Sequence, residues 1–366
     1  MSNKKTRVGI IGIQPDRSWA AIAHIPALQA LGDDYEVTAV STTRQASADE
    51  AAKRYGIPDA YDNYQALVTS PDVDLVVVTV KVPAHLELVT AALNAGKHVY
   101  CEWPLGNGLA EAETLAALAK AKGVHGVIGL QARMSPVLAY AKDLIAQGYV
   151  GEVLSVSLVG TALSWGAFVE QPNAYNADIK NGVTPLTIPV SHTLDALTAV
   201  LGEFKDVSAV LANRRHKTTV IETGEVIDLT AQDQVVVAGT LQDGTVVSLH
   251  YRGGMDQGTG LLWEIQGSKG VLRLSAFGGH AQIFDLTLQG ATEGEQALAP
   301  LTTPEEYYHT SLRSGPPLNV AEVYAALTRD LREGTKLVAD FDHAVIRHRM
   351  VAAIENAAAT GSRQSL

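Results

Sequence analysis

The stretch RVGIIGIQPDRSWAAIAHIPALQALG, residues 7–32, decides the first half of the fold. It opens with RVGIIGI, a short β-branched run, and continues with SWAAIAHIPALQALG, whose apolar residues recur at helical spacing and stop at Gly32. The change from one period to the other predicts a strand, a turn and a helix, in that order. This order is typical of the start of an alternating α/β chain.

The alternation continues to about residue 130. Strand patterns recur in YEVTAVSTT, VDLVVVTV, KHVYCE and VHGVIGLQ, with helical patterns between them. The run VDLVVVTV is apolar on both faces, as a strand must be when helices cover both sides of a parallel sheet. The segment SADEAAKRYG is expected to form a helix that opens at Ser47 and closes at Gly56. This alternation of strands with helices predicts a doubly wound parallel sheet over residues 1–132.

The pattern changes after residue 133. A helix, VLAYAKDLIAQG, leads into β-rich or alternating runs that are joined by Asp-Gly and Ser-Lys-Gly turns, among them QDQVVVAGTLQDGTVVSLHYRGG. Such turns between alternating runs predict antiparallel hairpins. Helical patterns recur in SHTLDALTAVLG and in two segments that close the chain. We therefore expect residues 133–366 to form a second domain of the α+β class, built on an open antiparallel sheet.

Composition excludes several classes of protein. The chain has 366 residues and a formal charge of -11, which disfavours nucleic acid as a partner because phosphate binding needs a concentrated basic face. No apolar run reaches the ~20 residues that span a bilayer, so no membrane association is expected. Cys101 is the only cysteine, which indicates a reducing compartment, and we expect a cytoplasmic protein. No cysteine or HExxH pattern accompanies the histidines, so no metal site is expected.

The turn after the first predicted strand is the expected place for a dinucleotide. A glycine-rich turn there lets the backbone approach a pyrophosphate at a helix N-terminus. This chain keeps Gly12 as the first glycine of that pattern and continues with Ile13-Gln14-Pro15-Asp16-Arg17. The position favours a binding turn made by Gly12 and Gln14, in which Arg17 supplies a positive charge to the pyrophosphate. The alternative is a plain strand-to-helix turn with Arg17 in solvent.

The end of the second predicted strand discriminates between the two nicotinamide coenzymes. A carboxylate there binds the ribose 2′-hydroxyl, whereas small hydroxyls with an arginine accommodate a 2′-phosphate. The chain has Ser41-Thr42-Thr43-Arg44 and no carboxylate. These residues predict that NADP is preferred over NAD, through Ser41, Thr42 and Arg44; NAD remains the alternative.

The motifs resemble those of the glucose–fructose oxidoreductase / inositol dehydrogenase (Gfo/Idh/MocA) family. The segments RVGIIG, VDLVVVTVKVPAH, AALNAGKHVYCEWPL and GVIGLQARMSP carry the resemblance in order and spacing. It implies an N-terminal Rossmann domain for the dinucleotide, a C-terminal domain for substrate and oligomerisation, and hydride transfer at a sugar or polyol carbon. It also implies that the coenzyme site includes Val80, His85, Glu102, Trp103, Pro104 and Arg133.

Two positions depart from the family pattern. The family's proton-handling lysine, between Glu and Pro, is Trp103 here, and the aspartate four residues before His192 is Ile188. An indole cannot exchange a proton near pH 7. The acid–base candidates that remain are His192, which titrates in the useful range, then Lys81 and Tyr175. Structural roles are the alternative for each: His192 paired with Asp195, and Lys81 in solvent.

Trp103 and the sparse glycine pattern resemble the branch of the family that includes the fungal galactose/lactose-metabolism repressors. Two functions follow from this resemblance. The first is an NADP(H)-preferring oxidoreductase with an atypical active site, acting on a carbohydrate-like hydroxyl or carbonyl compound. The second is a dinucleotide-binding regulator or sensor of sugar metabolism without turnover. The resemblance also implies a homo-oligomer, a dimer or tetramer, that covers the open sheet.

Overall fold

The first stretch of the chain folds as a strand, a π-helical turn and an α-helix in the computed structural model, which describes residues 4–254 and 258–366. These elements are β1 (Thr6–Ile11), η1 (Ala20–His24) and α1 (Ile25–Ala30). Pro26 lies in the first turn of α1, where a missing N–H leaves no helical bond unmade. The predicted helix is therefore present, but its first turn is wound as a π-helix.

The chain divides into two units, each described here by itself. The first holds the chain up to Gln131 together with Tyr308–His348, and the second holds Ala132–Tyr307 and Arg349–Leu366. The sequence predicted a single boundary between residues 132 and 133. The difference is Tyr308–His348, which returns to the first unit because α8 (Pro316–Glu333) packs on η1 and α1.

Among the described residues of the first unit, six strands form a parallel sheet in the order β3-β2-β1-β4-β5-β6. The remaining strands of this sheet are β2 (Tyr35–Ser41), β3 (Asp59–Tyr61), β4 (Leu75–Val78), β5 (His98–Glu102) and β6 (Gly126–Gly129). The strand order reverses beside β1, as in doubly wound folds that bind a dinucleotide at this point.

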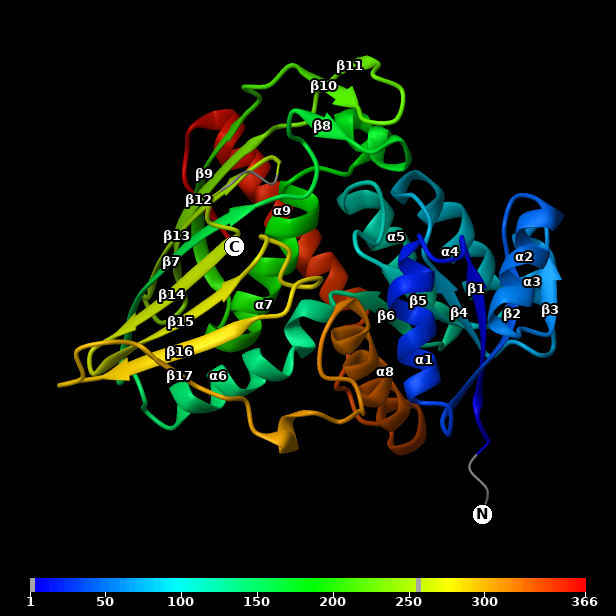
Figure 1. Cartoon of the computed structure of the whole chain (residues 1–366), viewed down its shortest axis with the longest axis horizontal. Coiled ribbons are helices and arrows are strands. Elements are labelled where there is room, and N and C mark those ends of the chain that lie inside the picture. The colour runs from blue at the N-terminus through cyan, green and yellow to red at the C-terminus, as the bar shows by residue number, and fades with distance from the viewer. Residues whose placement is uncertain (1–3, 255–257) are drawn as a thin grey trace. The chain divides into compact units, whose positions relative to one another are not determined.

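Helices connect these strands and form two groups of neighbours. They are α2 (Gln45–Tyr55), α3 (Tyr64–Thr69), η2 (Val82–Ala84), α4 (His85–Asn94) and α5 (Leu109–Lys122), in addition to η1 and α1. The helices α3, α4 and α5 pack in one row, and α1, η1 and α8 pack together in another. Right-handed crossovers put the connections after β1 and β2 on one face of the sheet and those after β3, β4 and β5 on the other. Figure 1 shows these helices around the β1–β6 sheet.

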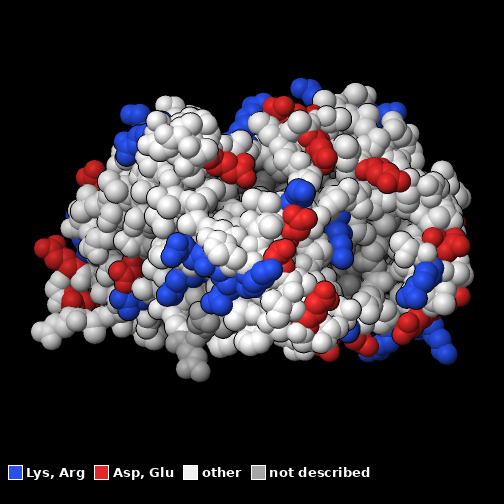
Figure 2. Space-filling model, turned by 90° about the horizontal axis from the view of Figure 1, so that it is seen from above, with Lys and Arg blue, Asp and Glu red and all other residues white. Residues whose placement is uncertain are grey.

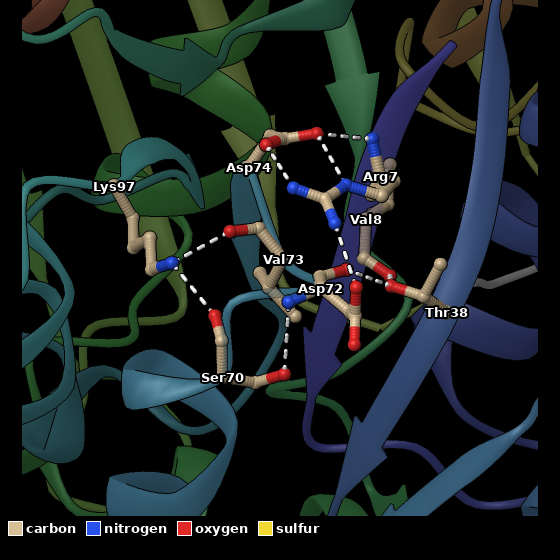
Figure 3. Close-up of polar contacts among 8 residues, drawn as sticks. All are labelled: Arg7, Val8, Thr38, Ser70, Asp72, Val73, Asp74 and Lys97. Carbon is tan, nitrogen blue, oxygen red and sulfur yellow. Dashed lines mark hydrogen bonds and ion pairs between the residues drawn. The ribbon is translucent and has the colours of Figure 1, made fainter.

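Polar contacts close the amino-terminal edge of this sheet (Figure 3). The Arg7 guanidinium donates to both carboxylate oxygens of Asp74, at 2.9 and 2.8 Å, and to Asp72 at 2.7 Å. Lys97 Nζ donates to the carbonyls of Ser70 and Val73 at 2.8 and 2.7 Å. The hydrogen bond from Arg7 lowers the pKa of Asp74. The opposite, carboxyl-terminal edge carries the predicted binding residues.

The second unit is built on a larger sheet. In its described part, nine strands follow the order β17-β16-β15-β14-β7-β13-β12-β9-β18. They are β7 (Val153–Thr161), β9 (Phe204–Ala212), β12 (Gln234–Leu241), β13 (Val246–Arg252), β14 (Leu261–Gly267), β15 (Gly270–Ala276), β16 (Thr287–Thr292), β17 (Ala299–Pro300) and β18 (Gln364–Ser365). The neighbouring strands of this sheet pair antiparallel except β7 with β13, so the sheet is mixed. The predicted fold class is confirmed, with this parallel pair as an addition.

Helices and a small sheet complete the second unit. The helices are η3 (Gln131–Met134), which begins in the first unit, α6 (Pro136–Ala146), η4 (Gln171–Ala177), η5 (Ile179–Asn181), η6 (Leu186–Val190), α7 (Ser191–Leu201), η7 (Glu305–Tyr307) and the last part of α9 (Phe341–Thr360). The small sheet has the order β11-β10-β8 and contains β8 (Phe168–Val169), β10 (Lys217–Val220) and β11 (Val226–Asp228). Thr193 on α7 bonds Tyr251 on β13, with 2.7 Å between the hydroxyl oxygens, which fixes α7 on the large sheet.

Candidate functional site

The predicted coenzyme turn begins at Gly12, directly after β1. Its φ of +93° lies in the left-handed region that favours glycine. A Cβ at this position would lie 2.4 Å from Cγ1 of Val80 and 3.1 Å from the carbonyl oxygen of Thr79. Thr79 Oγ1 donates to the carbonyls of Ile11 and Gly12 at 3.1 and 2.9 Å. The absence of a side chain at Gly12 thus lets the turn approach the end of β4.

The rest of the turn is held by its own side chains and by α2. The N–H of Gln14 donates to Ser18 Oγ at 2.9 Å, and Ser18 Oγ donates back to the Gln14 carbonyl at 2.9 Å. Asp16 accepts from Arg54 of α2 at 3.1 Å. Gln14 and Arg17 are exposed, so both side chains are available to a ligand at this edge of the sheet.

The end of β2 lies beside the same turn, because the N–H of Gly12 donates to the carbonyl of Ser41 at 3.0 Å. Thr42 Oγ1 donates to the carbonyl of Arg44 at 2.8 Å and lies 2.8 Å from Ser47 Oγ. The expected helix start at Ser47 is wrong. The helix α2 starts at Gln45 and Arg44 is its N-cap, since Ser47 Oγ bonds back to the Arg44 carbonyl within the first turn. Arg44 is exposed at this helix start.

The connection after β4 contains Val80, Lys81 and His85. Lys81 is exposed and precedes η2. His85 is buried, with Nε2 3.0 Å from the Val80 carbonyl oxygen and Nδ1 2.8 Å from the Pro104 carbonyl oxygen. Burial lowers the pKa of His85, and the hydrogen bonds to these two carbonyls act in the opposite direction. His85 therefore links the connection after β4 to the connection after β5.

The residues Glu102, Trp103 and Pro104 follow the end of β5. Glu102 ends the strand and accepts from His24 Nε2 at 2.9 Å. Trp103 is only 5% exposed, and its ring centroid lies 4.5 Å from that of His348. Burial lowers the pKa of His348 to about 4. The indole, at the position where the resemblance implies a lysine, is thus packed within the first unit against a neutral imidazole.

The second unit brings together Arg133 and the start of α7. Arg133 Nη1 donates to Oδ1 of the fully buried Asp195 at 3.1 Å. His192 lies one turn before Asp195 and is also buried. Burial, together with the nearby His192, lowers the pKa of His280 to about 3. Ile188 lies in the π-helical turn η6, so an apolar side chain occupies the turn that precedes His192.

Tyr175 lies on η4, a different element of the second unit. It is half-buried, and burial raises the pKa of its hydroxyl. Its neighbour Asn176 donates to Ser164 Oγ at 3.4 Å, and the N–H of Leu163 donates to His280 Nε2 at 2.9 Å. These contacts link η4 to His280 and through it to the start of α7.

Sequence reasoning missed two residues of the first unit, His24 and Tyr324. His24 Nδ1 lies 2.8 Å from the Tyr324 hydroxyl oxygen, and the two residues are 300 positions apart in the chain. No periodicity links positions this far apart. The signal that bears on His24 is local: a histidine among the alanines and isoleucines of an apolar helical face.

The surface charge is mixed. In Figure 2, acidic and basic side chains lie beside one another over much of the face shown. Within residues 4–254 and 258–366, no group of three or more His, Cys, Asp or Glu side chains is arranged to hold a metal ion. In the same part of the chain, the helices are each too short or too polar to cross a lipid bilayer.

Comparisons with known proteins agree with this geometry. Residues 6–129 match the model of the GFO/IDH/MocA oxidoreductase family with its NAD-binding Rossmann fold, and residues 136–276 match that of the C-terminal domain of Gal80p. Dehydrogenase aclE of Aspergillus oryzae is 32% identical over 98% of this chain and 98% of its own length.

Two further proteins resemble the chain. Levoglucosan dehydrogenase of Pseudarthrobacter phenanthrenivorans is 30% identical over 45% of this chain and 42% of its own. The crystal structure of a super-repressor mutant of Gal80p from Saccharomyces cerevisiae has a TM-score of 0.88 and 25% identity, covering 99% of this chain and 98% of that one. The chain belongs to the GFO/IDH/MocA family of oxidoreductases, whose N-terminal domain is an NAD-binding Rossmann fold.

Proposed function

We propose that the protein is an NADP(H)-preferring oxidoreductase that acts on a hydroxyl or carbonyl group of a small carbohydrate-like molecule. The observation that carries the proposal is the end-to-end match to a dehydrogenase, which spans 98% of both chains. The match to levoglucosan dehydrogenase supports a carbohydrate-like substrate. The first unit would hold the dinucleotide, and the second would hold substrate and form the oligomer.

The first unit would hold the dinucleotide at the turn that begins with Gly12. This glycine packs against Val80 and Thr79, which leaves no room for a side chain at its position. Gln14 and Arg17 would contact the pyrophosphate. Ser41, Thr42 and the exposed Arg44 would receive the 2′-phosphate of NADP at the start of α2, where the helix dipole favours an anion. When bound, the coenzyme would supply or accept the hydride.

Proton transfer needs a group other than Trp103. His192 is the first of the sequence candidates because a histidine side chain can exchange a proton near neutral pH. It lies on α7, one turn before Asp195 of the Arg133–Asp195 ion pair. Lys81 and Tyr175 are the others. Each would be tested by the effect of its replacement on turnover.

Coenzyme preference is tested by fluorescence titration with NADPH and NADH. Arg44→Ala is expected to weaken NADPH binding about 10-fold or more, since a charged hydrogen bond contributes about 1.5–3 kcal/mol, and to leave NADH binding unchanged. Lys53→Ala is the matched control, because Lys53 is an exposed cation in the last turn of the same helix. Tighter binding of NADH than NADPH by the unmodified protein would refute the preference.

Turnover is tested with a panel of sugars and polyols while the absorbance of the reduced coenzyme is followed. Loss of turnover with retained coenzyme binding in His192→Ala would support His192 in that role. A specific observation favours a second function, a non-catalytic dinucleotide-binding regulator: Trp103 is buried at the lysine position, and residues 136–276 match the Gal80p model. Coenzyme binding without turnover across the panel would support that second function.

A homo-oligomer, dimer or tetramer, is proposed through the exposed face of the nine-stranded sheet. Val210 and Val246 are 60% and 55% exposed, and both lie in register with exposed-face residues of β12. Burial of such a face stabilises an assembly. Light scattering after size-exclusion chromatography would give the mass, and a monomer would refute this assignment. We also propose a cytoplasmic location.

A further inference from the structure

We propose that Glu102, positioned by His24 and Tyr324, is the residue that takes up and returns the substrate proton. The inference rests on the proposed oxidoreductase function and names a catalytic group for it. None of the sequence candidates for this role was Glu102, which the family resemblance placed only beside the coenzyme.

The three side chains form a connected line within the first unit. Glu102 Oε1 lies 2.9 Å from His24 Nε2, and His24 Nδ1 lies 2.8 Å from the Tyr324 hydroxyl oxygen. His24 and Tyr324 are fully buried, whereas the Glu102 side chain is 14% exposed. The line therefore starts at a carboxylate that solvent reaches and ends at a buried hydroxyl.

Proton uptake by Glu102 requires one direction for these two hydrogen bonds. Nε2 of His24 carries the proton and donates to the Glu102 carboxylate, which can only accept. Nδ1 of His24 then accepts the hydroxyl hydrogen of Tyr324. This arrangement holds Oε1 of Glu102 in one orientation and leaves proton uptake to Oε2.

The backbone is shaped to allow this arrangement. His24 is the last residue of the π-helical turn η1, and π-turns inside helices are frequent at functional sites. On the other side of Glu102, a Cβ at Gly129 would lie 2.7 Å from Oε1 and 2.9 Å from Oε2. The glycine at the end of β6 thus makes room for the carboxylate.

The location of Glu102 suits proton transfer beside a coenzyme. It ends β5 at the carboxyl-terminal edge of the sheet, the edge at which Gly12 follows β1 and at which doubly wound sheets bind dinucleotides. Its neighbour Trp103 cannot exchange a proton, and a carboxylate can.

The proposed step balances as follows in the direction of oxidation. The O–H bond of the substrate hydroxyl would break and its proton would go to Oε2 of Glu102. The C–H bond of the carbon that carries the hydroxyl would break at the same time, its hydride would pass to the oxidised coenzyme, and the C=O double bond would form. In the reverse direction, the protonated Glu102 returns the proton to the oxygen. His24 and Tyr324 act as positioning residues and do not contact substrate.

The test compares Glu102→Gln, Tyr324→Phe and Tyr35→Phe in the whole chain, with circular dichroism and thermal unfolding as the check of folding. Tyr35→Phe is the matched control: it removes a buried hydroxyl from the same aromatic cluster, one that bonds the Tyr324 carbonyl and not His24. Glu102→Gln keeps an acceptor for His24 and is expected to lower kcat by about 10²–10⁴-fold and to remove the acid limb of the pH profile. Tyr324→Phe is expected to lower kcat about 5-fold, the equivalent of one hydrogen bond, and Tyr35→Phe to leave it unchanged.

A second readout does not depend on turnover. The ¹⁵N resonances of the His24 ring, assigned with His24→Gln, are expected to show a protonated Nε2 and a hydrogen-bonded Nδ1. Tyr324→Phe should shift the Nδ1 resonance, and Tyr35→Phe should not. A proton on Nδ1 in the unmodified protein would overturn the arrangement.

The outcomes separate this inference from the proposed function. If the unmodified protein binds coenzyme but turns over no substrate, the oxidoreductase function fails and the catalytic role of Glu102 fails with it. If it turns over substrate and Glu102→Gln retains its rate and its acid limb, only the role of Glu102 is refuted.

Discussion

Replacement of Gly12 by alanine tests the close approach of the proposed coenzyme turn to the end of β4. The backbone at Gly12 has a φ of +93°, and left-handed backbone costs an L-residue about 1–2 kcal/mol. The new Cβ would also lie 2.4 Å from Cγ1 of Val80, and overpacking of this kind costs about 1–3 kcal/mol. Gly12→Ala is therefore expected to destabilise the first unit by about 2–5 kcal/mol.

A matched control isolates the steric part of this effect. Gly56 closes α2 with a φ of +69°, and a Cβ there would meet no atom within 4 Å. Gly56→Ala should lower the free energy of unfolding only by the cost of the left-handed backbone, about 1 kcal/mol. Both variants would be unfolded in urea, with hydrogen exchange in β1 reporting on the first unit, and titrated with NADPH. Equal destabilisation by the two substitutions, or unchanged NADPH binding in Gly12→Ala, would refute the reasoning.

Three further substitutions test buried and charged groups. Tyr100→Phe is expected to leave stability unchanged or raise it, as judged by thermal unfolding, because the buried Tyr100 hydroxyl has no hydrogen-bond partner among the described residues. Asp74→Asn should lower stability by about 1.5 kcal/mol at pH 7. The pKa of Asp74 is lowered by Arg7, so this difference should shrink in urea unfolding curves as pH falls below about 4. The pKa of His348 is lowered to about 4 in the folded state, so the unfolded chain binds its proton first and stability falls between pH 6.5 and 4. His348→Gln should reduce this loss of unfolding free energy by up to about 3 kcal/mol. An equal loss in both proteins between pH 6.5 and 4 would contradict the lowered pKa of His348.

The order of elements could be read from the chain because it depends on local periodicity. The run Val76–Val78 is fully buried in β4, as its apolar character on both faces predicted, and the alternation around it gave the doubly wound order. The residues at which helices start were predicted less accurately. Ser47 has the chemistry of an N-cap, yet its hydroxyl bonds back to Arg44 inside the first turn of α2, since serine can do either.

The candidate coenzyme residues could also be predicted from local signals in the sequence. A glycine after a strand and the absence of a carboxylate after the next strand are features of sequence neighbours, and these segments meet in the structure through the bond from Gly12 to Ser41. The environment of Trp103 could not be predicted in this way. Its packing partner His348 lies 245 positions later, on a helix that the sequence assigned to the second domain.

The amino-acid sequence by itself determined the alternation of elements and predicted a dinucleotide turn after the first strand, because both depend on residue type at short spacing. Only the tertiary structure decided which side chains form the hydrogen-bonded line that begins at Glu102. The approach of His24 and Tyr324 to that carboxylate requires a π-helical turn, the return of α8 to the first unit and a glycine at residue 129. Hydrogen bonds between residues that are up to 300 positions apart arise from packing of whole elements, for which no local pattern in the chain provides a signal.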